Sequence, residues 1–159
     1  ADGHVRKSVW KARERGVLFD SADGYRNFSF HVFRRAYADG FFPDILSTDL
    51  IAERAFSPLL YGLPYVISKY LSLGVDIKTV LKAVTLNPAK ALGEKNLCMI
   101  KKGNSASLTV SAIKRDVNFA FPALDEDFSG HELLVPQCTI HKGSIKYAAL
   151  NFYARSGVS

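Results

Sequence analysis

The sequence is poor in residues that form metal sites or disulfides. It contains two cysteines, Cys98 and Cys138, and neither has a second cysteine or a histidine at the spacing of a zinc site. Cys138 and His141 are expected in one strand, where an offset of three residues points their side chains to opposite faces. We therefore interpret both cysteines as reduced structural residues, and we expect the protein to be cytoplasmic.

Several patterns that would indicate other functions are also absent. No uninterrupted apolar run reaches the length of a membrane span, and no basic start precedes an apolar stretch as in a signal peptide, so no membrane partner is expected. The sequence contains neither the phosphate-binding P-loop nor the dinucleotide-binding glycine pattern. It also lacks the nucleophile elbow of serine hydrolases. It begins at Ala1 without a methionine, as a fragment or a processed protein would.

The composition is that of a folded domain. The chain has 159 residues, of which 48% are hydrophobic, and this is enough for one sizeable core. The 21 lysines and arginines exceed the 15 aspartates and glutamates, which gives a net charge of +6. This surplus would suit an anionic partner. However, a basic face on the first expected helix is explained more simply by contact with solvent, so nucleic acid is not the expected partner.

The first forty residues alternate between helical and strand patterns. Residues 5–15 predict an amphipathic helix that ends at Gly16. The short apolar run at residues 17–20 (VLFD) predicts a buried strand that ends in an acid. A polar loop is expected over residues 21–27, and a second helix over residues 29–38.

The stretch at residues 41–50 (FFPDILSTDL) contains the next buried strand, at residues 45–46, with Asp49 near its C-terminal end. Helix and strand thus alternate, which is typical of parallel βα units. In such units the loops that follow the strands gather at one face, and ligands bind there. Asp23 and Asp49 both follow expected strands, so we expect both at that face.

Helical patterns continue as far as Gly93. A long loop is expected over residues 51–62 and helices over residues 63–73, 77–85 and 88–92. Asp76 is a suitable cap for the second of these helices. Its expected buried stripe consists of Ile77, Val80, Leu81 and Val84.

Beyond Gly93 the helical periodicity stops and strand patterns follow, with Gly, Pro and Asp between them. The expected strands are residues 107–113, 118–121, 132–140 and 144–150. We therefore predict two parts, residues 1–93 and residues 94–159, with a boundary near Gly93.

The order of several short motifs resembles the amidohydrolase superfamily, and most closely its dihydroorotase-like amidohydrolase and deacetylase group. Each motif is weak alone, but their shared order and spacing over nearly the whole chain make the signal fairly specific. The motifs are ARERGV (residues 12–17), FD (19–20), FSF (28–30), GFFPD (40–44), STDL (47–50), the segment from LP to SK (63–69), TLNPA (85–89) and residues 103–110.

The resemblance implies an α/β fold. The family has a metal-binding (β/α)8 barrel of TIM type, which takes about 250 residues, and a small β domain built from both chain ends. This chain resembles the last strands and helices of that barrel (residues 1–93), followed by part of the small β-sandwich domain (residues 94–159). The family's HxH motif, its metal-bridging lysine and the histidine of its fifth strand would lie upstream. The histidines present here lack HxH spacing: His4, His31, His131 and His141.

Asp49 matches the family's aspartate at the end of the eighth barrel strand, so the resemblance implies a catalytic residue and metal ligand. Such a carboxylate takes a proton from the metal-bound water and passes it to the leaving group. The structural alternative is that Asp49 caps the following loop. Asp23 stands where the family has a histidine metal ligand, and the alternative there is a solvated loop residue. Related enzymes often have a second histidine where this chain has Ile51.

The resemblance thus implies the C-terminal portion of a metal-dependent amidohydrolase that hydrolyses a C–N or ester bond in a small molecule, as a deacetylase or dihydroorotase does. Zinc or another divalent metal is the expected cofactor of the complete enzyme. This chain alone is expected to bind none tightly and to be inactive. Its expected partners are the small-molecule substrate and either the missing N-terminal barrel half or further copies of itself. A non-catalytic remnant or interaction module, and a basic nucleic-acid-binding domain, stay open as alternatives.

Overall fold

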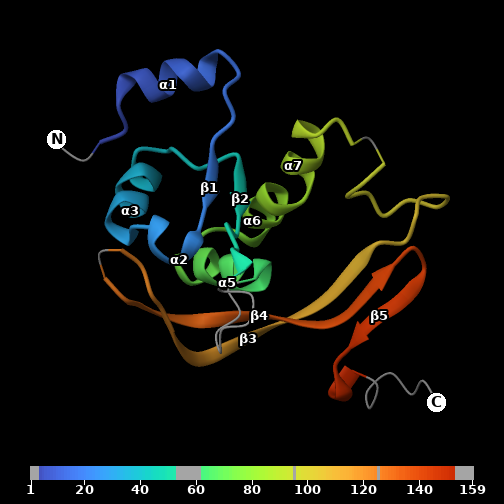
Figure 1. Ribbon diagram of the computed structural model, residues 1–159. Helices are drawn as coiled ribbons and strands as arrows, with labels where there is room; N and C mark the ends of the chain where they lie inside the picture. Colours follow the sequence, from blue (N-terminus) through green and yellow to red (C-terminus); the bar gives the residue numbers. More distant parts are fainter. Residues whose placement is uncertain (1–3, 53–61, 95, 125, 153–159) are drawn as a thin grey trace.

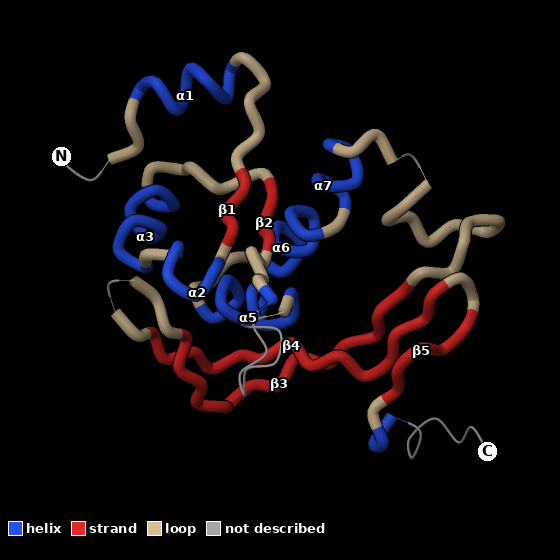
Figure 2. The backbone as a smooth tube through the Cα atoms, in the orientation of Figure 1, coloured by secondary structure: helices blue, strands red, loops and turns tan. Residues whose placement is uncertain are grey.

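The computed structural model describes residues 4–52, 62–94, 96–124 and 126–152. The described chain is an α/β structure with a two-stranded sheet and a three-stranded sheet (Figures 1 and 2). Its elements are α1 (Lys7–Glu14), β1 (Asp20–Ala22), α2 (Gly24–Asn27), α3 (Phe30–Ala38), β2 (Ile45–Ser47), α5 (Leu63–Ser72), α6 (Ile77–Val84), α7 (Leu86–Ala91), β3 (Leu108–Phe121), β4 (Phe128–His141) and β5 (Ser144–Ala148).

The two short strands β1 and β2 lie side by side and run parallel, as the sequence predicts. Ser21 pairs with Leu46 at the centre of the register. Leu46 is buried against the helices, and Ser21 faces the same way, since its hydroxyl accepts a hydrogen bond from Tyr70 of α5 at 2.8 Å. Side chains alternate along a strand, so the neighbours Asp20 and Ser47 lie on the opposite face of this sheet.

The position of the first strand differs from the prediction. Residues 17–19 of the apolar run precede β1, which begins at Asp20, and Leu18 is 55% exposed. Phe19 packs edge-on against Phe41 at 5.3 Å between ring centroids. The predicted polar loop at residues 21–27 is also wrong, because it contains the end of β1 and the short helix α2. Polar residues are accommodated in this strand because Asp20 is exposed and Ser21 accepts a hydrogen bond from Tyr70.

The predicted helices are confirmed, with small shifts at their ends. Ser29 caps α3 by accepting a hydrogen bond from the Val32 amide, and Asp76 caps α6 in the same way through Thr79. The buried face of α6 differs from the predicted stripe in one residue. Leu81 is 40% exposed, whereas Ala83 is buried. Most of the expected loop at residues 51–62 lies outside the described residues.

The core is built around α5 and is rich in aromatic rings. Tyr70 of α5 contacts Phe28, Phe33 and Phe42 edge-on, with ring centroids 5.0 to 5.9 Å apart. Phe30 and Val66 are fully buried within the same cluster. Burial of this apolar area is the main source of stability for the unit formed by the sheet and its helices.

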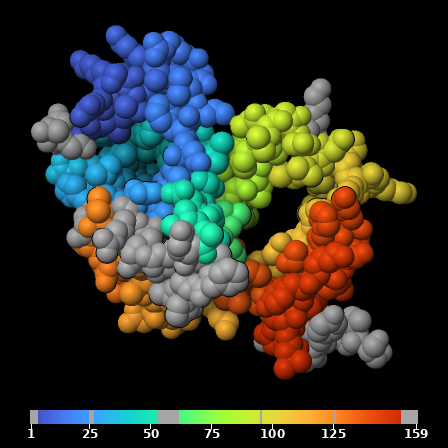
Figure 3. Space-filling model, in the orientation of Figure 1, coloured from blue at the N-terminus to red at the C-terminus, as the bar shows by residue number. Residues whose placement is uncertain are grey.

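The strands after α7 form an antiparallel meander, β3-β4-β5. The two strands predicted at residues 107–113 and 118–121 are one long strand, β3, with an irregular register between Arg115 and Phe119. One end of β3 and β4 packs on α5 and buries Phe121 in the aromatic core. The other end projects away with β5, and Figure 3 shows an open gap between it and the region of α7.

The two cysteines have different environments. Cys138 of β4 is buried, in agreement with a structural role, whereas Cys98 is exposed, so the structural interpretation of Cys98 is wrong. Both are free thiols. His141, three residues after Cys138, is exposed, as the strand alternation predicts. None of the helices in the described part of the chain has the length and apolarity of a membrane span. The division of the chain near Gly93 stays a prediction.

Candidate functional site

The C-terminal ends of β1 and β2 bring the loops of Asp23 and Asp49 together. The Asp23 amide donates a hydrogen bond to the Ser47 carbonyl at 2.9 Å, and the Gly24 amide donates one to the Thr48 carbonyl at 3.1 Å. The ladder between the strands therefore continues beyond their ends. As expected from parallel strands, the two aspartates follow neighbouring strands at one edge of the sheet.

Asp23 is buried in an ion pair. Its carboxylate lies 2.6 Å from the Lys69 ammonium of α5, and the two side chains are 4% and 1% exposed. The ammonium also lies over the ring of Phe28, 4.5 Å from its centroid. Asp23 is therefore not the solvated loop residue of the alternative interpretation.

Burial of the pair opposes charge on both partners. Loss of solvent raises the pKa of Asp23 and lowers the pKa of Lys69, while their mutual attraction acts in the opposite direction on each. At 2.6 Å, and with the cation over an aromatic face, we regard the ion pair as the stable form near neutral pH.

Asp49 is exposed and has an unusual backbone conformation. Its φ of 47° lies in the left-handed region, which aspartate visits more readily than most residues. Its Oδ2 atom accepts a hydrogen bond from the side-chain amide of Asn27 in α2 at 2.7 Å. Within the described residues, no other group donates to this carboxylate. The amide of the following residue, Leu50, donates to the Thr48 hydroxyl at 3.3 Å instead. The described contacts therefore give no support to a capping role for Asp49.

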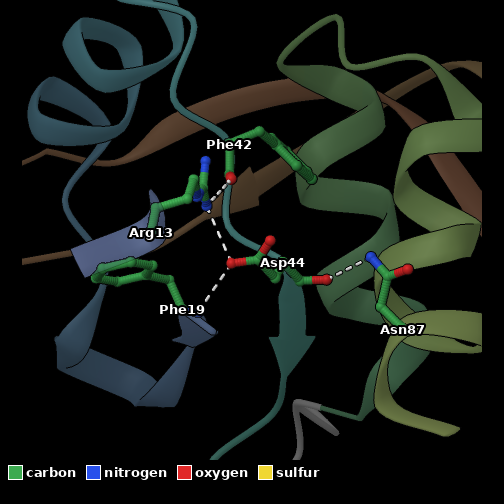
Figure 4. A network of polar contacts seen from close by, with 5 residues as sticks. All are labelled: Arg13, Phe19, Phe42, Asp44 and Asn87. Atoms are coloured by element: carbon green, nitrogen blue, oxygen red, sulfur yellow. Dashed lines mark hydrogen bonds and ion pairs between the residues drawn. The ribbon is translucent and has the colours of Figure 1, made fainter. Parts of the chain in front are cut away.

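The opposite end of β2 carries a polar network with a structural role (Figure 4). Asp44 accepts hydrogen bonds from the Phe19 amide at 2.9 Å and from the Arg13 guanidinium at 3.1 Å. The Asn87 side chain donates to the Asp44 carbonyl at 2.7 Å. The network ties α1, both strands and α7 together at the end of the sheet remote from Asp49.

A groove of about 260 Å³ lies beside this network and not beside the two candidate aspartates. Leu18, Asp44, Ile45, Asn87, Lys90 and Ala91 line it. Since Asp44 and Ile45 mark the beginning of β2, the groove is at the wrong end of the strands for the expected ligand site.

The candidate residues do not fit a metal ion by themselves. Across the described ranges, no three His, Cys, Asp or Glu side chains lie close enough together to hold a metal. Asp23 already has a cationic partner, which leaves Asp49 as the accessible carboxylate at this edge. A catalytic zinc site usually takes three protein ligands, so a metal here would need ligands from outside the described residues.

Two participants of the site were not identified from the sequence. Lys69 is the single charged residue of the apolar helix α5, and a lone cation in a buried helix signals a buried partner. Asn27 gave no such signal, because α2 was interpreted as a loop. The contact between Asn27 and Asp49 also joins residues 22 positions apart, which local patterns do not reveal.

Comparisons with known proteins identify relatives in sequence. No protein-family model matches the chain. A deacetylase of Enterococcus faecalis is 27% identical over 73% of this chain and 31% of its own length. A deacetylase of Agrobacterium fabrum is 34% identical over 60% of this chain and 23% of its own length. The chain thus spans less than a third of these relatives.

Solved structures give the same picture. An adenine deaminase matches with a TM-score of 0.83 and 25% identity, over 92% of this chain and 39% of its own. A dihydroorotase matches with a TM-score of 0.77 and 26% identity, over 91% of this chain and 38% of its own. Both neighbours are amidohydrolases of the TIM-barrel type. The resemblance seen in the sequence is therefore confirmed. This chain is related to the amidohydrolase superfamily and spans part of the length of its members.

Proposed function

We propose that this chain is the C-terminal portion of a metal-dependent amidohydrolase that hydrolyses a C–N or ester bond in a small molecule. One observation carries the proposal. Asp49 lies just beyond the end of β2, exposed, with one oxygen held by Asn27 and the other free of hydrogen bonds from any described residue. The deacetylases found as relatives favour an acyl group, such as an acetyl group, as the part removed.

In this proposal β1 and β2 are the last two strands of a TIM-type barrel, and β3 to β5 are part of a β-sandwich. The sheet supports this, because its Leu46 face is covered by helices, whereas no helix of the described residues covers its Asp20 face. On that second face the Ser47 hydroxyl donates to the Asp20 carboxylate at 2.7 Å. A polar inner face lined by further strands would suit the interior of a barrel near its ligand edge.

Asp49 is the general base and acid of the proposed reaction. Its free oxygen accepts a proton from the attacking water, and the same carboxyl group then donates this proton to the departing amine or alcohol. Zinc or another divalent metal would serve the complete enzyme, and Asp49 would hold it together with ligands from outside the described residues. The chain alone binds no metal tightly and is inactive, and the small-molecule substrate binds only to the complete barrel.

The Asp23–Lys69 pair supports a second candidate function. Asp23 occupies the position at which the resemblance implies a histidine ligand, and here it is bound to a buried cation. A site that has lost a ligand in this way suits a non-catalytic relative that keeps the scaffold and binds a partner. Catalysis is favoured over this alternative because Asp49 remains exposed at the ligand edge.

The test is the substitution Asp49→Asn in the complete protein that contains this chain, assayed with 4-nitrophenyl acetate and N-acetyl amino acids. Turnover should fall by about 10²–10⁴-fold, since the amide keeps the shape of the carboxylate but removes its basicity. Asp116→Asn is the matched control, because Asp116 is also exposed with a positive φ, in β3. Unchanged turnover in Asp49→Asn would remove the catalytic assignment. A wild-type protein without hydrolytic activity on these compounds would favour the non-catalytic alternative.

A further inference from the structure

Asn27 lies at the end of α2 and reaches across to the loop after β2. Its side-chain amide nitrogen is 2.7 Å from Oδ2 of Asp49, and both residues are exposed. The distance is that of a strong hydrogen bond to a charged acceptor. A contact of this kind between two exposed side chains, one in α2 and one in the loop after β2, needs a backbone that holds both segments in place.

Gly24 provides that backbone arrangement. Its amide binds the Thr48 carbonyl at 3.1 Å, which joins the start of α2 to the residue before Asp49. A Cβ atom at position 24 would lie 2.5 Å from the Asn27 amide nitrogen and 2.8 Å from Oδ2 of Asp49. Both distances are too short for a real carbon atom, so the absence of a side chain at Gly24 makes room for this hydrogen bond. The φ of 37° at Gly24 also favours glycine.

The geometry points to Asn27 as a positioning residue for Asp49, an inference that rests on the proposed function. A hydrogen bond to Oδ2 fixes the plane of the carboxylate and leaves Oδ1 directed away from Asn27 for proton transfer. Asp49 makes this contact from a left-handed backbone conformation, with a φ of 47°. An amide suits this role because its NH₂ group donates without taking up the proton that Asp49 must transfer.

Asn27 thereby determines how often Asp49 is in a productive orientation. A misplacement of about 1 Å can cost as much as 10²-fold in rate. Substrate contacts would be unaffected, because Asn27 acts through Asp49. Loss of Asn27 should therefore lower kcat and leave KM unchanged.

The test is a double-mutant cycle in the complete protein, with 4-nitrophenyl acetate as the substrate. Asn27→Ala should lower kcat by about 10- to 100-fold with an unchanged KM. In the Asp49→Asn background, the same substitution should change kcat by less than about twofold, because the residue that it positions no longer transfers a proton. Asn118→Ala, at an exposed position of β3, is the matched control and should have no effect. The same 10- to 100-fold fall in kcat from Asn27→Ala in the Asp49→Asn background would contradict the inference.

A second measurement keeps the inference testable if Asn27→Ala fails to fold. With ¹⁵N-labelled asparagine, the side-chain amide signal of Asn27 should move more than that of any other asparagine when Asp49 is replaced by alanine. A signal that stays in place would show that Asn27 does not hold Asp49. If instead Asp49→Asn leaves turnover unchanged, the proposed function fails along with the positioning role of Asn27, and the NMR signal still decides whether the contact exists.

Discussion

The Lys69 ammonium lies 2.6 Å from the Asp23 carboxylate, and the two side chains are almost completely buried. The pair joins the loop after β1 to α5 through two residues that are 46 positions apart along the chain. Because both side chains are buried, water cannot take the place of either charged partner. The pair therefore constrains how the sheet and its covering helix fit together, and it does so next to the loop of Asp49.

Breaking this ion pair on one side should be costly. Asp23→Asn or Lys69→Met leaves an uncompensated buried charge, and each should lower the free energy of unfolding by roughly 3–5 kcal/mol. Urea denaturation followed by circular dichroism measures the change. The double variant Asp23→Asn/Lys69→Met should recover much of the loss, because it contains no buried charge.

The exposed pair of Arg115 and Glu132 provides the control. Its atoms are 2.9 Å apart, but Arg115 is 68% exposed. Arg115→Met should therefore change the free energy of unfolding by less than about 1 kcal/mol. If the single and double variants of the buried pair lost the same stability, the two charges would not be energetically coupled.

Tyr70 should make the protein sensitive to alkaline pH. Burial is the main cause that raises the pKa of its hydroxyl above the ordinary value of 10.0. Between these two pKa values the unfolded chain loses this proton and the folded chain keeps it. Stability should therefore be unaffected below about pH 10 and fall as the pH rises further.

Spectrophotometric titration near 295 nm checks this prediction. Tyr70→Phe should remove one late-titrating tyrosine and flatten the loss of stability above pH 10. Tyr37→Phe is the control, because Tyr37 is 41% exposed. A Tyr70 that loses its proton near the ordinary pKa of 10.0 would show that water reaches its hydroxyl.

The sequence was sufficient to predict the parallel pair of strands and most helices. Asp76 can be recognised as a cap from the helical pattern that follows it, and the apolar residues at positions 45 and 46 mark β2. The first strand was misplaced because the apolar run at residues 17–20 looks like a buried strand. In the structure, the aromatic side chain of Phe19 packs on Phe41 before the strand begins.

The arrangement of the site was less predictable for a physical reason. Strand order and the polar ends of strands were enough to expect Asp23 and Asp49 at one edge. The partners of each carboxylate come from other elements, Lys69 from α5 and Asn27 from α2. Contacts between distant residues depend on how the helices pack, and no periodic pattern in the sequence reports that packing.

Gly130 should be essential for docking the long hairpin on α5. A Cβ atom there would lie 2.3 Å from the ring of Phe121 and 2.5 Å from the Ser72 hydroxyl. Ser72 in turn donates to the Glu132 carbonyl at 3.2 Å, so the extra atom would push β4 away from the helix. Gly130→Ala should destabilise the protein by about 1–3 kcal/mol in urea denaturation. Ser129→Ala, at the exposed neighbouring position, should be nearly neutral.

The last prediction concerns self-association of the isolated chain. Among the described residues, β1 and β2 pair only with each other, so each has a free edge that invites pairing with another strand. Leu18, 55% exposed beside this sheet, adds apolar surface to the groove near β2. The chain should therefore form oligomers whose mass rises with concentration in light scattering, and Leu18→Ser should weaken them. Leu124→Ser, a matched change at a 67% exposed leucine elsewhere, should not. A chain that stays monomeric at millimolar concentration would mean that the strand edges are protected.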